Sequence, residues 1–520
     1  MSFIEKLKGV FKKFMPTKNV QELLQIAPAI SSEMKNAIEL WENMYKNQSP
    51  WLSENVHSLG LAPMIASEKA RLATVEMEIK VTGDSEKAEF MDECLKKLVW
   101  SIRKNLEYGI ALGSLVIKPY ITKMPDGTYN IEFNFTKATD FYPLSFSTEG
   151  NVIEAAFIDR IIDKKYVYSK VEYHKLEGSS VIVKNMAFRT EYNMSHSTIT
   201  PTYPTQLGTP VALTEVSAWS SLEPEIILNQ VNTMMFAYFK MPQANNIDLS
   251  SPLGVSGFSR AVGLIKNADE QYSNLLWEFE GGQLAIDVDR TALNPLKDKN
   301  GNLKEALPKL QNRLYRRDLD LGDDEAYNVF SPQLRDVSIL NGLNAILQRI
   351  EDVCEVSRGT ISQPEYAEAR TATELKILKQ RSYAANCDIQ KALEMSIRSV
   401  VNILDIYCTL YNICPDGDYE VAYKWDDSII VDKDAERQVD LLDINAGLLS
   451  KIEYRMKWMG ETRVQAEQAL KDIRQERMDD MKISQLFSTG MQTEAQASHD
   501  KLVRSNESIE TTTNDEEADK

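Results

Sequence analysis

The sequence predicts an α+β protein with one very long helix, because two different hydrophobic periods occupy separate parts of the chain. Residues 115–192 alternate apolar and polar side chains with a period of two, as antiparallel strands do. Residues 371–411 carry apolar or small side chains at helical spacing, with no Gly or Pro between them. A helix of about forty residues is roughly 60 Å long, which exceeds the width of an ordinary domain. Such a helix indicates a part in a large assembly.

The period-two region predicts five strands in an antiparallel meander. They are expected at Leu115–Pro119, Tyr129–Phe135, Val152–Ile162, Tyr166–His174 and Ser180–Tyr192, with turn residues between them. His174 is a lone imidazole on its strand, so we expect a cross-strand neighbour rather than a metal ligand. Residues 193–222 are rich in Ser, Thr and Pro and predict an extended loop.

A Gly-rich segment precedes the first of these strands, with Gly109, Gly113 and Ser114 at the spacing of a phosphate-binding loop. A phosphate loop also needs a Lys after its last Gly, and it follows a strand and opens a helix. Here that Lys is absent and the helix comes first. The segment therefore predicts the end of a helix and the start of a strand.

The long helix begins with Thr371 and Glu374, a Thr-x-x-Glu capping box in which the two side chains satisfy free backbone N–H groups. Gly359 and Pro364 exclude helix from the preceding loop, residues 357–370. Other helices and strands are expected at residues 20–48, 86–109, Phe258–Phe279, Leu284–Val288, Asp336–Val356 and Tyr419–Trp425. A helical unit is expected over 432–480, broken near Asn445-Ala446-Gly447 and Met459-Gly460.

Residues 283–335 predict an irregular insert between two helices of similar length. Its most basic part contains Arg313, Arg316 and Arg317, and acidic residues including Asp318 and Asp320 follow directly. These arginines suit either a phosphate contact or ion pairs with the acids across a subunit boundary, and we favour the ion pairs. The helices on either side of the insert can stand side by side. Neither has apolar residues on all sides, so such a pair suits a ring in which neighbouring subunits complete the packing.

The sequence predicts a helix near the N-terminus and disorder near the C-terminus. Residues 3–15 form a basic amphipathic helix, suited either to a membrane surface or to packing on protein, and we favour packing on protein. The tail beyond about residue 490 is polar, lacks periodicity and ends in acids, so it is expected to be disordered.

Composition excludes several classes of protein. The net charge of −18 argues against a protein that grips DNA through phosphates, and no apolar run approaches the length of a membrane span. Five scattered cysteines indicate reduced thiols, and the N-terminus does not resemble a secretory signal. The chain has no Walker motif, zinc-ligand spacing, nucleophile elbow or dinucleotide loop. The sequence therefore predicts neither an enzyme nor a metal or cofactor.

Four segments, in their order and spacing, carry a resemblance to a known family. They are Tyr108–Tyr120, Asn245–Ser256, Ser357–Ser362 with Arg370–Glu374, and Asp434–Met456. Together they resemble the portal, or head–tail connector, proteins of tailed double-stranded DNA bacteriophages, in particular the type from long-tailed phages of Gram-positive bacteria. The likeness covers nearly all of residues 20–480.

The resemblance implies the portal fold and its division into named parts. These are a wing (20–255), a stem helix (256–282), a clip (283–335), a second stem helix (336–356), a tunnel loop (357–370), a long wing helix with its strand (371–431) and a helical crown (432–482). Residues 1–19 and 483–520 match no part of the family. In the tunnel loop, the residues expected to face DNA are Gln363, Pro364, Glu365, Tyr366, Glu368 and Arg370. In the clip, Arg313, Arg316, Arg317, Asp318 and Asp320 are expected to contact the terminase or a connector protein.

The resemblance also implies function and partners. The chain is expected to form a ring, a dodecamer in assembled heads, at one capsid vertex of the virion after assembly in the host cytoplasm. Its expected partners are the large terminase subunit, a head-completion or adaptor protein, the major capsid and scaffolding proteins, and DNA that passes without sequence specificity; no membrane is involved. The alternatives are a non-enzymatic scaffold, a peripheral membrane protein or another virion subunit.

Overall fold

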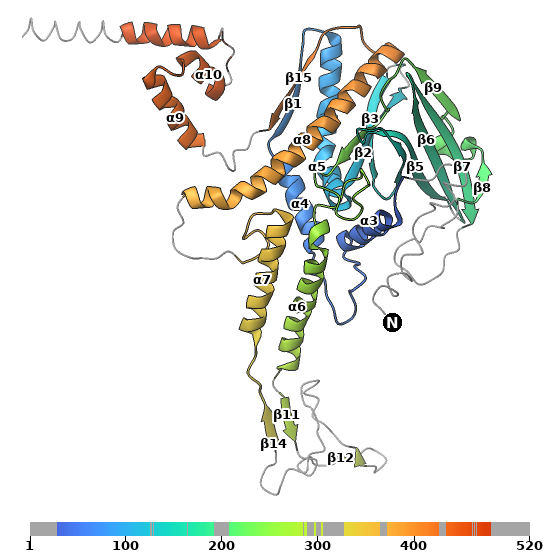
Figure 1. The fold of residues 1–520 in the computed structure, drawn as a ribbon, viewed down its shortest axis with the longest axis vertical. Helices are drawn as coiled ribbons and strands as arrows, with labels where there is room; N and C mark the ends of the chain where they lie inside the picture. Colours follow the sequence, from blue (N-terminus) through green and yellow to red (C-terminus); the bar gives the residue numbers. More distant parts are fainter. Residues whose placement is uncertain are drawn as a thin grey trace, which may run out of the picture. The chain divides into compact units, whose positions relative to one another are not determined.

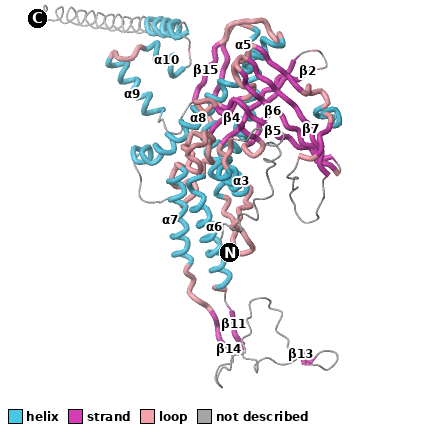
Figure 2. Tube along the Cα trace, turned by 45° about the vertical axis from the view of Figure 1, so that its right-hand side comes forward, coloured by secondary structure: helices cyan, strands magenta, loops and turns pink. Residues whose placement is uncertain are grey.

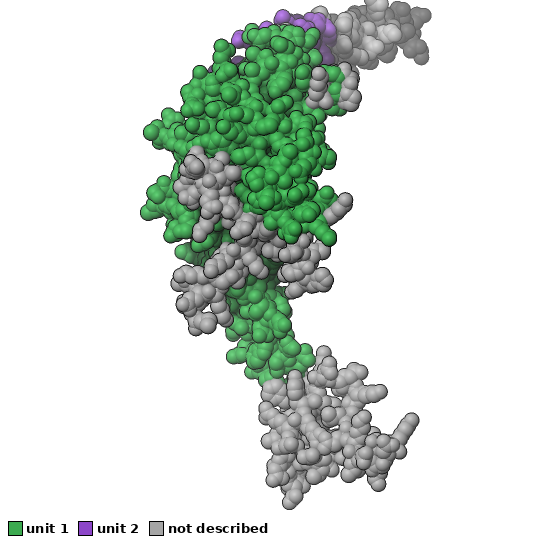
Figure 3. All heavy atoms as spheres, turned by 90° about the vertical axis from the view of Figure 1, so that its right-hand side faces the viewer, with its two compact units in different colours: residues 1–426 green, residues 427–520 purple. Residues whose placement is uncertain are grey.

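A computed structural model describes most of the chain, and it mixes helices with several small sheets (Figure 1). The described residues are 29–124, 127, 129–163, 165–191, 207–283, 285–288, 296–297, 303–304, 327–363, 372–425, 433–459, 461, 463 and 465–479. The chain divides into two compact units, residues 1–426 and 427–520, which Figure 3 colours separately. Among the described residues, every helix is too short or too polar to cross a membrane.

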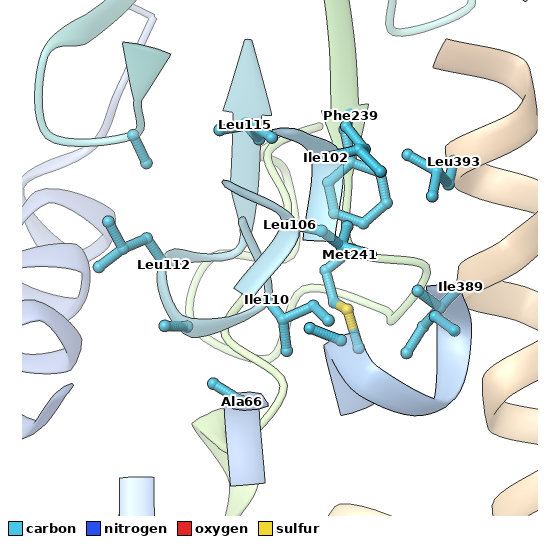
Figure 4. Close-up of a cluster of buried hydrophobic side chains, with 14 of the residues drawn as sticks. Ala66, Ile102, Leu106, Ile110, Leu112, Leu115, Phe239, Met241, Ile389 and Leu393 are labelled. Atoms are coloured by element: carbon cyan, nitrogen blue, oxygen red, sulfur yellow. The ribbon is translucent and has the colours of Figure 1, made fainter. Parts of the chain in front are cut away.

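The main core of the first unit is formed by helices and the edge of a small sheet. The helices are α3 (Ser32–Tyr45), α4 (Leu61–Thr74), α5 (Glu86–Leu112) and α8 (Ala372–Tyr411). Figure 4 shows Ile102, Leu106 and Ile110 of α5 meeting Ile389 and Leu393 of α8 around Phe239. All six side chains are fully buried, so one face of each helix supplies the core.

The expected long helix is confirmed, since α8 contains 40 residues. Its buried side chains recur every three or four residues from Ile389 to Cys408. The Trp425 indole N–H donates to Glu394 at 2.8 Å, and the Tyr407 hydroxyl donates to the carbonyl of Pro119 at 3.1 Å. The second half of α8 is therefore held by both packing and directional bonds. The expected capping box lies outside the described residues, which include neither Thr371 nor the Glu374 side chain.

The expected strands are present, but the expectation of a single meander is wrong. β2 (Ser114–Lys123) pairs with β3 (Tyr129–Lys137) on one edge and with β10 (Ala237–Lys240) on the other. A second sheet has the order β4-β5-β6-β7-β8, with β9 also paired to β7. Its strands are Phe141–Phe146, Val152–Asp163, Tyr166–Glu177, Ser180–Glu191, Thr209–Val211 and Glu225–Asn229. The free edge of β2 is covered by a strand more than a hundred residues away, which a local alternation cannot indicate.

Two further corrections concern segments expected to be helix or loop. Helix was expected over residues 20–48, of which the structure describes 29–48. There α3 begins only at Ser32 and ends at Tyr45, and the Ser31 hydroxyl caps it by accepting the N–H of Met34. β1 (Met77–Thr82) was not expected, and it pairs along its whole length with β15 (Glu420–Trp425). The described part of residues 193–222 contains β8 and two short 3₁₀ turns rather than an extended loop alone.

Residues 283–335 are more regular than expected. β11 (Ala285–Val288) pairs with β14 (Tyr327–Phe330), and β12 (Leu296–Lys297) pairs with β13 (Leu303–Lys304). The flanking helices are α6 (Val262–Gly281) and α7 (Asp336–Cys354), both close to their expected bounds. The strand β11 was expected, whereas its partner β14 was missed.

The second unit contains α9 (Lys433–Ala446), α10 (Lys451–Met459) and a further helix over 465–479. Breaks between these helices fall where they were expected. Ser450 and Glu453 form a capping box at α10, because each side chain accepts the backbone N–H of the other. The Trp458 indole N–H donates to Asp440 of α9 at 2.7 Å, which joins the two helices. The amphipathic segment 3–15 and the acidic tail lie outside the described residues.

The Gly-rich segment ends α5, as expected. Gly113 is the residue after the helix, with φ of +87°, and its carbonyl accepts the N–H of Met241 at 3.0 Å. A Cβ at this position would lie 2.6 Å from the carbonyl oxygen of Gly254. The close approach of two backbones thus requires glycine here.

Gly113→Ala is expected to destabilise the first unit by about 3 kcal/mol or more, because it adds backbone strain to a steric clash. Thermal unfolding of the two proteins measures the loss. Gly178→Ala is the matched control, since Gly178 also has positive φ (+63°), but a Cβ added there would meet nothing within 4 Å. Equal losses for the two variants would show that strain alone decides the outcome.

Candidate functional site: a helical pair and the loop that follows it

The first candidate site is the antiparallel pair of α6 and α7, which runs into the β11–β14 ribbon (Figures 1 and 2). Glu278 near the end of α6 joins Arg335 just before α7. The carboxylate accepts the Arg335 backbone N–H at 2.9 Å and two guanidinium N–H groups at 2.7 and 3.2 Å. Leu334 packs against Gly282, where a side chain would collide with it. These contacts fix the register of the pair at the point where it becomes a ribbon.

The two ends of this pair differ in burial. Near the core, Ile265 and Ala268 of α6 and Ile350 and Cys354 of α7 are buried. At the ribbon end, large apolar side chains from both helices and from the adjoining turn are exposed: Leu276, Trp277, Phe279, Leu334, Val337 and Leu340. Trp277 is 65% exposed and Val337 is 64% exposed. We call these six residues the apolar end of the pair. A group of exposed apolar side chains of this kind is typical of an interaction surface.

The second candidate site is the start of the loop after α7, which a buried carboxylate holds in place. Glu351 is fully buried, and its oxygens accept the backbone N–H groups of Gly359, Ile361 and Ser362 at 3.3, 2.6 and 2.9 Å. The Ser362 hydroxyl donates to the same carboxylate at 2.7 Å. Four donors thus converge on one side chain, so this buried carboxylate has the hydrogen-bond partners that its burial requires.

Two outer contacts extend this arrangement along α7. The Arg358 guanidinium makes two hydrogen bonds to Asp352, at 2.8 and 3.1 Å. The backbone N–H of Gln363 donates to the Asn344 side chain at 2.8 Å, two helical turns before Glu351. The described part of the loop therefore folds back along α7 and does not extend freely from its end.

Of the residues expected to face DNA, only Gln363 belongs to the described chain, and it is exposed. Pro364, Glu365, Tyr366, Glu368 and Arg370 lie outside it, as do the expected clip residues Arg313, Arg316, Arg317, Asp318 and Asp320. Sequence reasoning missed Glu351, although one signal was present. Glu351 lies four residues after Leu347, on the apolar face of its helix, where an acid needs buried partners.

A third feature is a cavity of about 640 Å³ between the two sheets and the end of α8, with a buried ionic cluster in its wall. Glu172 accepts from Lys118 at 3.1 Å, from Lys170 at 3.2 Å and from His174 at 2.7 Å. His174 was expected to be a cross-strand neighbour, and it indeed lies opposite Ala155 and Val183. Across the described residues, no three His, Cys, Asp or Glu side chains gather closely enough to hold a metal.

This cluster predicts that the stability of the first unit is sensitive to acid. Burial by itself would raise the pKa of Glu172, but Lys118, His174 and Lys170 outweigh it and hold the pKa well below its ordinary value of 4.5. A depressed carboxyl pKa contributes stability that is fully present above the unfolded value and is lost as the pH falls toward the folded value. The melting temperature should therefore fall below about pH 4.5. Glu172→Gln should flatten this dependence, whereas Glu177→Gln, an exposed change on the same strand, should leave it unchanged.

Comparison with known families decides what kind of protein carries these features. A family model described as "Phage portal protein, SPP1 Gp6-like" matches residues 27–482, which is most of the chain. The chain belongs to this family. Among curated proteins, no sequence matches it.

As a phage portal protein, the chain is a structural component of the virion with a role in DNA packaging. Its family places it at a vertex of the capsid, in a ring of identical subunits that works with capsid and terminase proteins. The resemblance drawn from the sequence is therefore confirmed. The α+β class is confirmed as well, by the described helices and sheets.

Proposed function

We propose that the portal protein forms a ring, twelve-fold in assembled heads, whose α6–α7 pairs surround the DNA channel as the stem. The observation that carries the proposal is the apolar end of the pair. One subunit leaves these side chains in water, and a ring covers them with the neighbouring pair. Burying apolar area at about 25 cal/mol per Å² favours this closure over the separated subunits.

We assign the remaining parts of the portal to the chain as follows. The wing comprises residues 20–255 together with 371–431, the stem residues 256–282 and 336–356, the clip 283–335, the tunnel loop 357–370 and the crown 432–482. The paired strands β11 and β14, which continue α6 and α7, support the placement of the clip. The ordered start of the loop on α7 supports its assignment as a separate part between stem and wing.

The clip is proposed to dock the large terminase subunit during packaging and a head-completion or adaptor protein afterwards, with Arg313, Arg316, Arg317, Asp318 and Asp320 as contacts. Major capsid and scaffolding proteins are proposed to meet the wing during assembly in the host cytoplasm. Packaging energy comes from the terminase, and the portal protein itself has no catalytic activity in this proposal.

The channel is proposed to pass DNA without reading its sequence. The net charge of −18 supports this, because every phosphate neutralised by the protein releases counterions and adds affinity that would slow the DNA. Gln363, Pro364, Glu365, Tyr366, Glu368 and Arg370 would then lie closest to the DNA, in a loop that acts as a steric valve. Heads whose portal lacks residues 363–368 should lose packaged DNA. Full retention in such heads would contradict the valve.

Mass measurement and negative-stain imaging of the purified protein test the ring. The expected result is a particle of about a dozen subunits with a central hole. If the protein stays monomeric even when it is co-expressed with capsid and scaffolding proteins, the ring proposal fails.

A further inference from the structure

One face of α5 is basic and carries a nearly fully exposed tryptophan. Trp100 lies three or four residues along the helix from each of four basic residues, so the five share one side of α5: Lys96, Lys97, Arg103 and Lys104. All five are exposed, and Trp100 is 92% exposed. We call these five residues the Trp100 stripe. The opposite side of α5 is buried, with Cys94, Leu95, Leu98, Ile102 and Leu106 in the core. The fold therefore gains nothing from a tryptophan on the outer side.

The charges of the stripe are only partly neutralised. Lys96 pairs with Asp92 at 2.6 Å, and Lys97 donates to the neutral side chain of Asn130 at 2.8 Å. Arg103 and Lys104 make no ion pair with any part of the chain that the structure describes. This basic surface belongs to a chain with a net charge of −18. Trp and Arg are also the residues that most often dominate the energy of protein interfaces. The stripe therefore fits an acidic segment that carries an apolar side chain.

The chain itself contains such a segment beyond the described residues. Residues 505–520 include six acids and one lysine: Glu507, Glu510, Asp515, Glu516, Glu517, Asp519 and Lys520. Ile509 lies between Glu507 and Glu510, so an apolar side chain is flanked by acids. On the stripe, Trp100 is flanked by Lys97 and by Arg103 in the same way. We propose that the C-terminal segment 505–520, from the same or a neighbouring subunit, binds the Trp100 stripe.

This contact would also affect how the protein meets DNA. A basic stripe with an exposed aromatic ring suits nucleic acid, because lysines and arginines bind phosphates and tryptophan stacks on bases. A segment tethered to the portal acts at a high effective concentration and so competes with DNA at the stripe. The acidic tail then keeps this surface of the portal from holding the genome. The proposal is independent of the ring, since it concerns two segments of one kind of chain.

A binding measurement tests the contact directly. A fluorescent peptide of residues 505–520 is titrated with the full-length protein and with a protein that ends at Arg504, and anisotropy reports binding. The truncated protein should bind the peptide at least tenfold more tightly than the full-length protein, whose stripe is already occupied. Trp100→Ala and Arg103→Glu in the truncated protein should each weaken binding about tenfold. Raising the salt concentration should also weaken it.

Controls separate this contact from general attraction between opposite charges. Lys391→Glu changes an exposed helical lysine on α8 and should leave peptide binding unchanged. A peptide with Ile509→Ser keeps every charge and should bind less tightly. Two results would overturn the proposal: no binding of the peptide to the truncated protein, or equal binding to Trp100→Ala. Binding of duplex DNA, but not of the peptide, to the truncated protein would assign the stripe to nucleic acid instead.

Discussion

Replacing Glu351 by alanine is expected to lower the free energy of unfolding by about 3–5 kcal/mol, because it leaves buried donors without their acceptor. Three backbone N–H groups and the Ser362 hydroxyl converge on this one carboxylate, and all four lose it together. The loop should then detach from the helix. Thermal unfolding measures the first effect, with a fall in melting temperature of about 5 °C or more.

Trypsin measures the second effect, since Arg358 lies inside the held segment. Cleavage after Arg358 should become at least tenfold faster in Glu351→Ala, because local opening controls the rate. Asp352→Ala is the matched control, as it removes only the exposed pair with Arg358 and should cost less than about 1 kcal/mol. Equal stability and equal cleavage in the two variants would show that Glu351 does not hold the loop.

Replacing Trp277 by aspartate is expected to abolish the ring while leaving the subunit folded. Trp277 is 65% exposed in one subunit, so the change removes little packing there. In a ring it would place a charge in each stem contact and remove a large aromatic side chain. Such a loss weakens each contact by about thirtyfold or more. Sedimentation velocity measures the assembly, and circular dichroism measures the fold.

Val337→Asp, on the facing helix, should have the same effect as Trp277→Asp. Ile227→Asp provides the comparison, because Ile227 is 55% exposed but lies on β9, away from the helical pair. Of these three variants, only Ile227→Asp is expected to form rings. Rings of normal size from Trp277→Asp would mean that the apolar end of the pair is covered by something other than a sister subunit.

The hydrophobic periodicity of the sequence was sufficient to predict its longest helix. The apolar positions of α8 repeat over 40 residues without Gly or Pro, and no other conformation buries them together. The helix ends near Gly113, Gly281 and Gly447 could also be predicted. Glycine is favoured at the end of a helix because its own backbone adopts the conformation needed there. The resemblance to the portal family rested on the order and spacing of four segments, and the family match over residues 27–482 confirmed it.

Strands and helices whose partners are distant in the sequence could not be predicted from periodicity. β1 is a short strand whose partner, β15, lies more than three hundred residues away, and α4 has a small-residue face that packs against α8 and α5. The division of the expected meander has the same cause, since β10 covers the edge of β2. Such pairings depend on which surfaces come into contact when the chain folds, and neighbouring residues in the sequence do not indicate this.

The same distinction between local and distant interactions applies to the candidate sites. The sequence alone determined an acidic α+β chain that resembles portal proteins, with a helix on either side of an insert and a long helix beyond them. Only the tertiary structure decided that Glu351 holds the following loop, that Glu172 joins Lys118, Lys170 and His174, and that Trp277 and Trp100 lie in solvent. Local backbone preferences depend on consecutive residues and can be predicted from them. Burial and hydrogen bonding depend on side chains that are distant in the sequence and that only folding brings together.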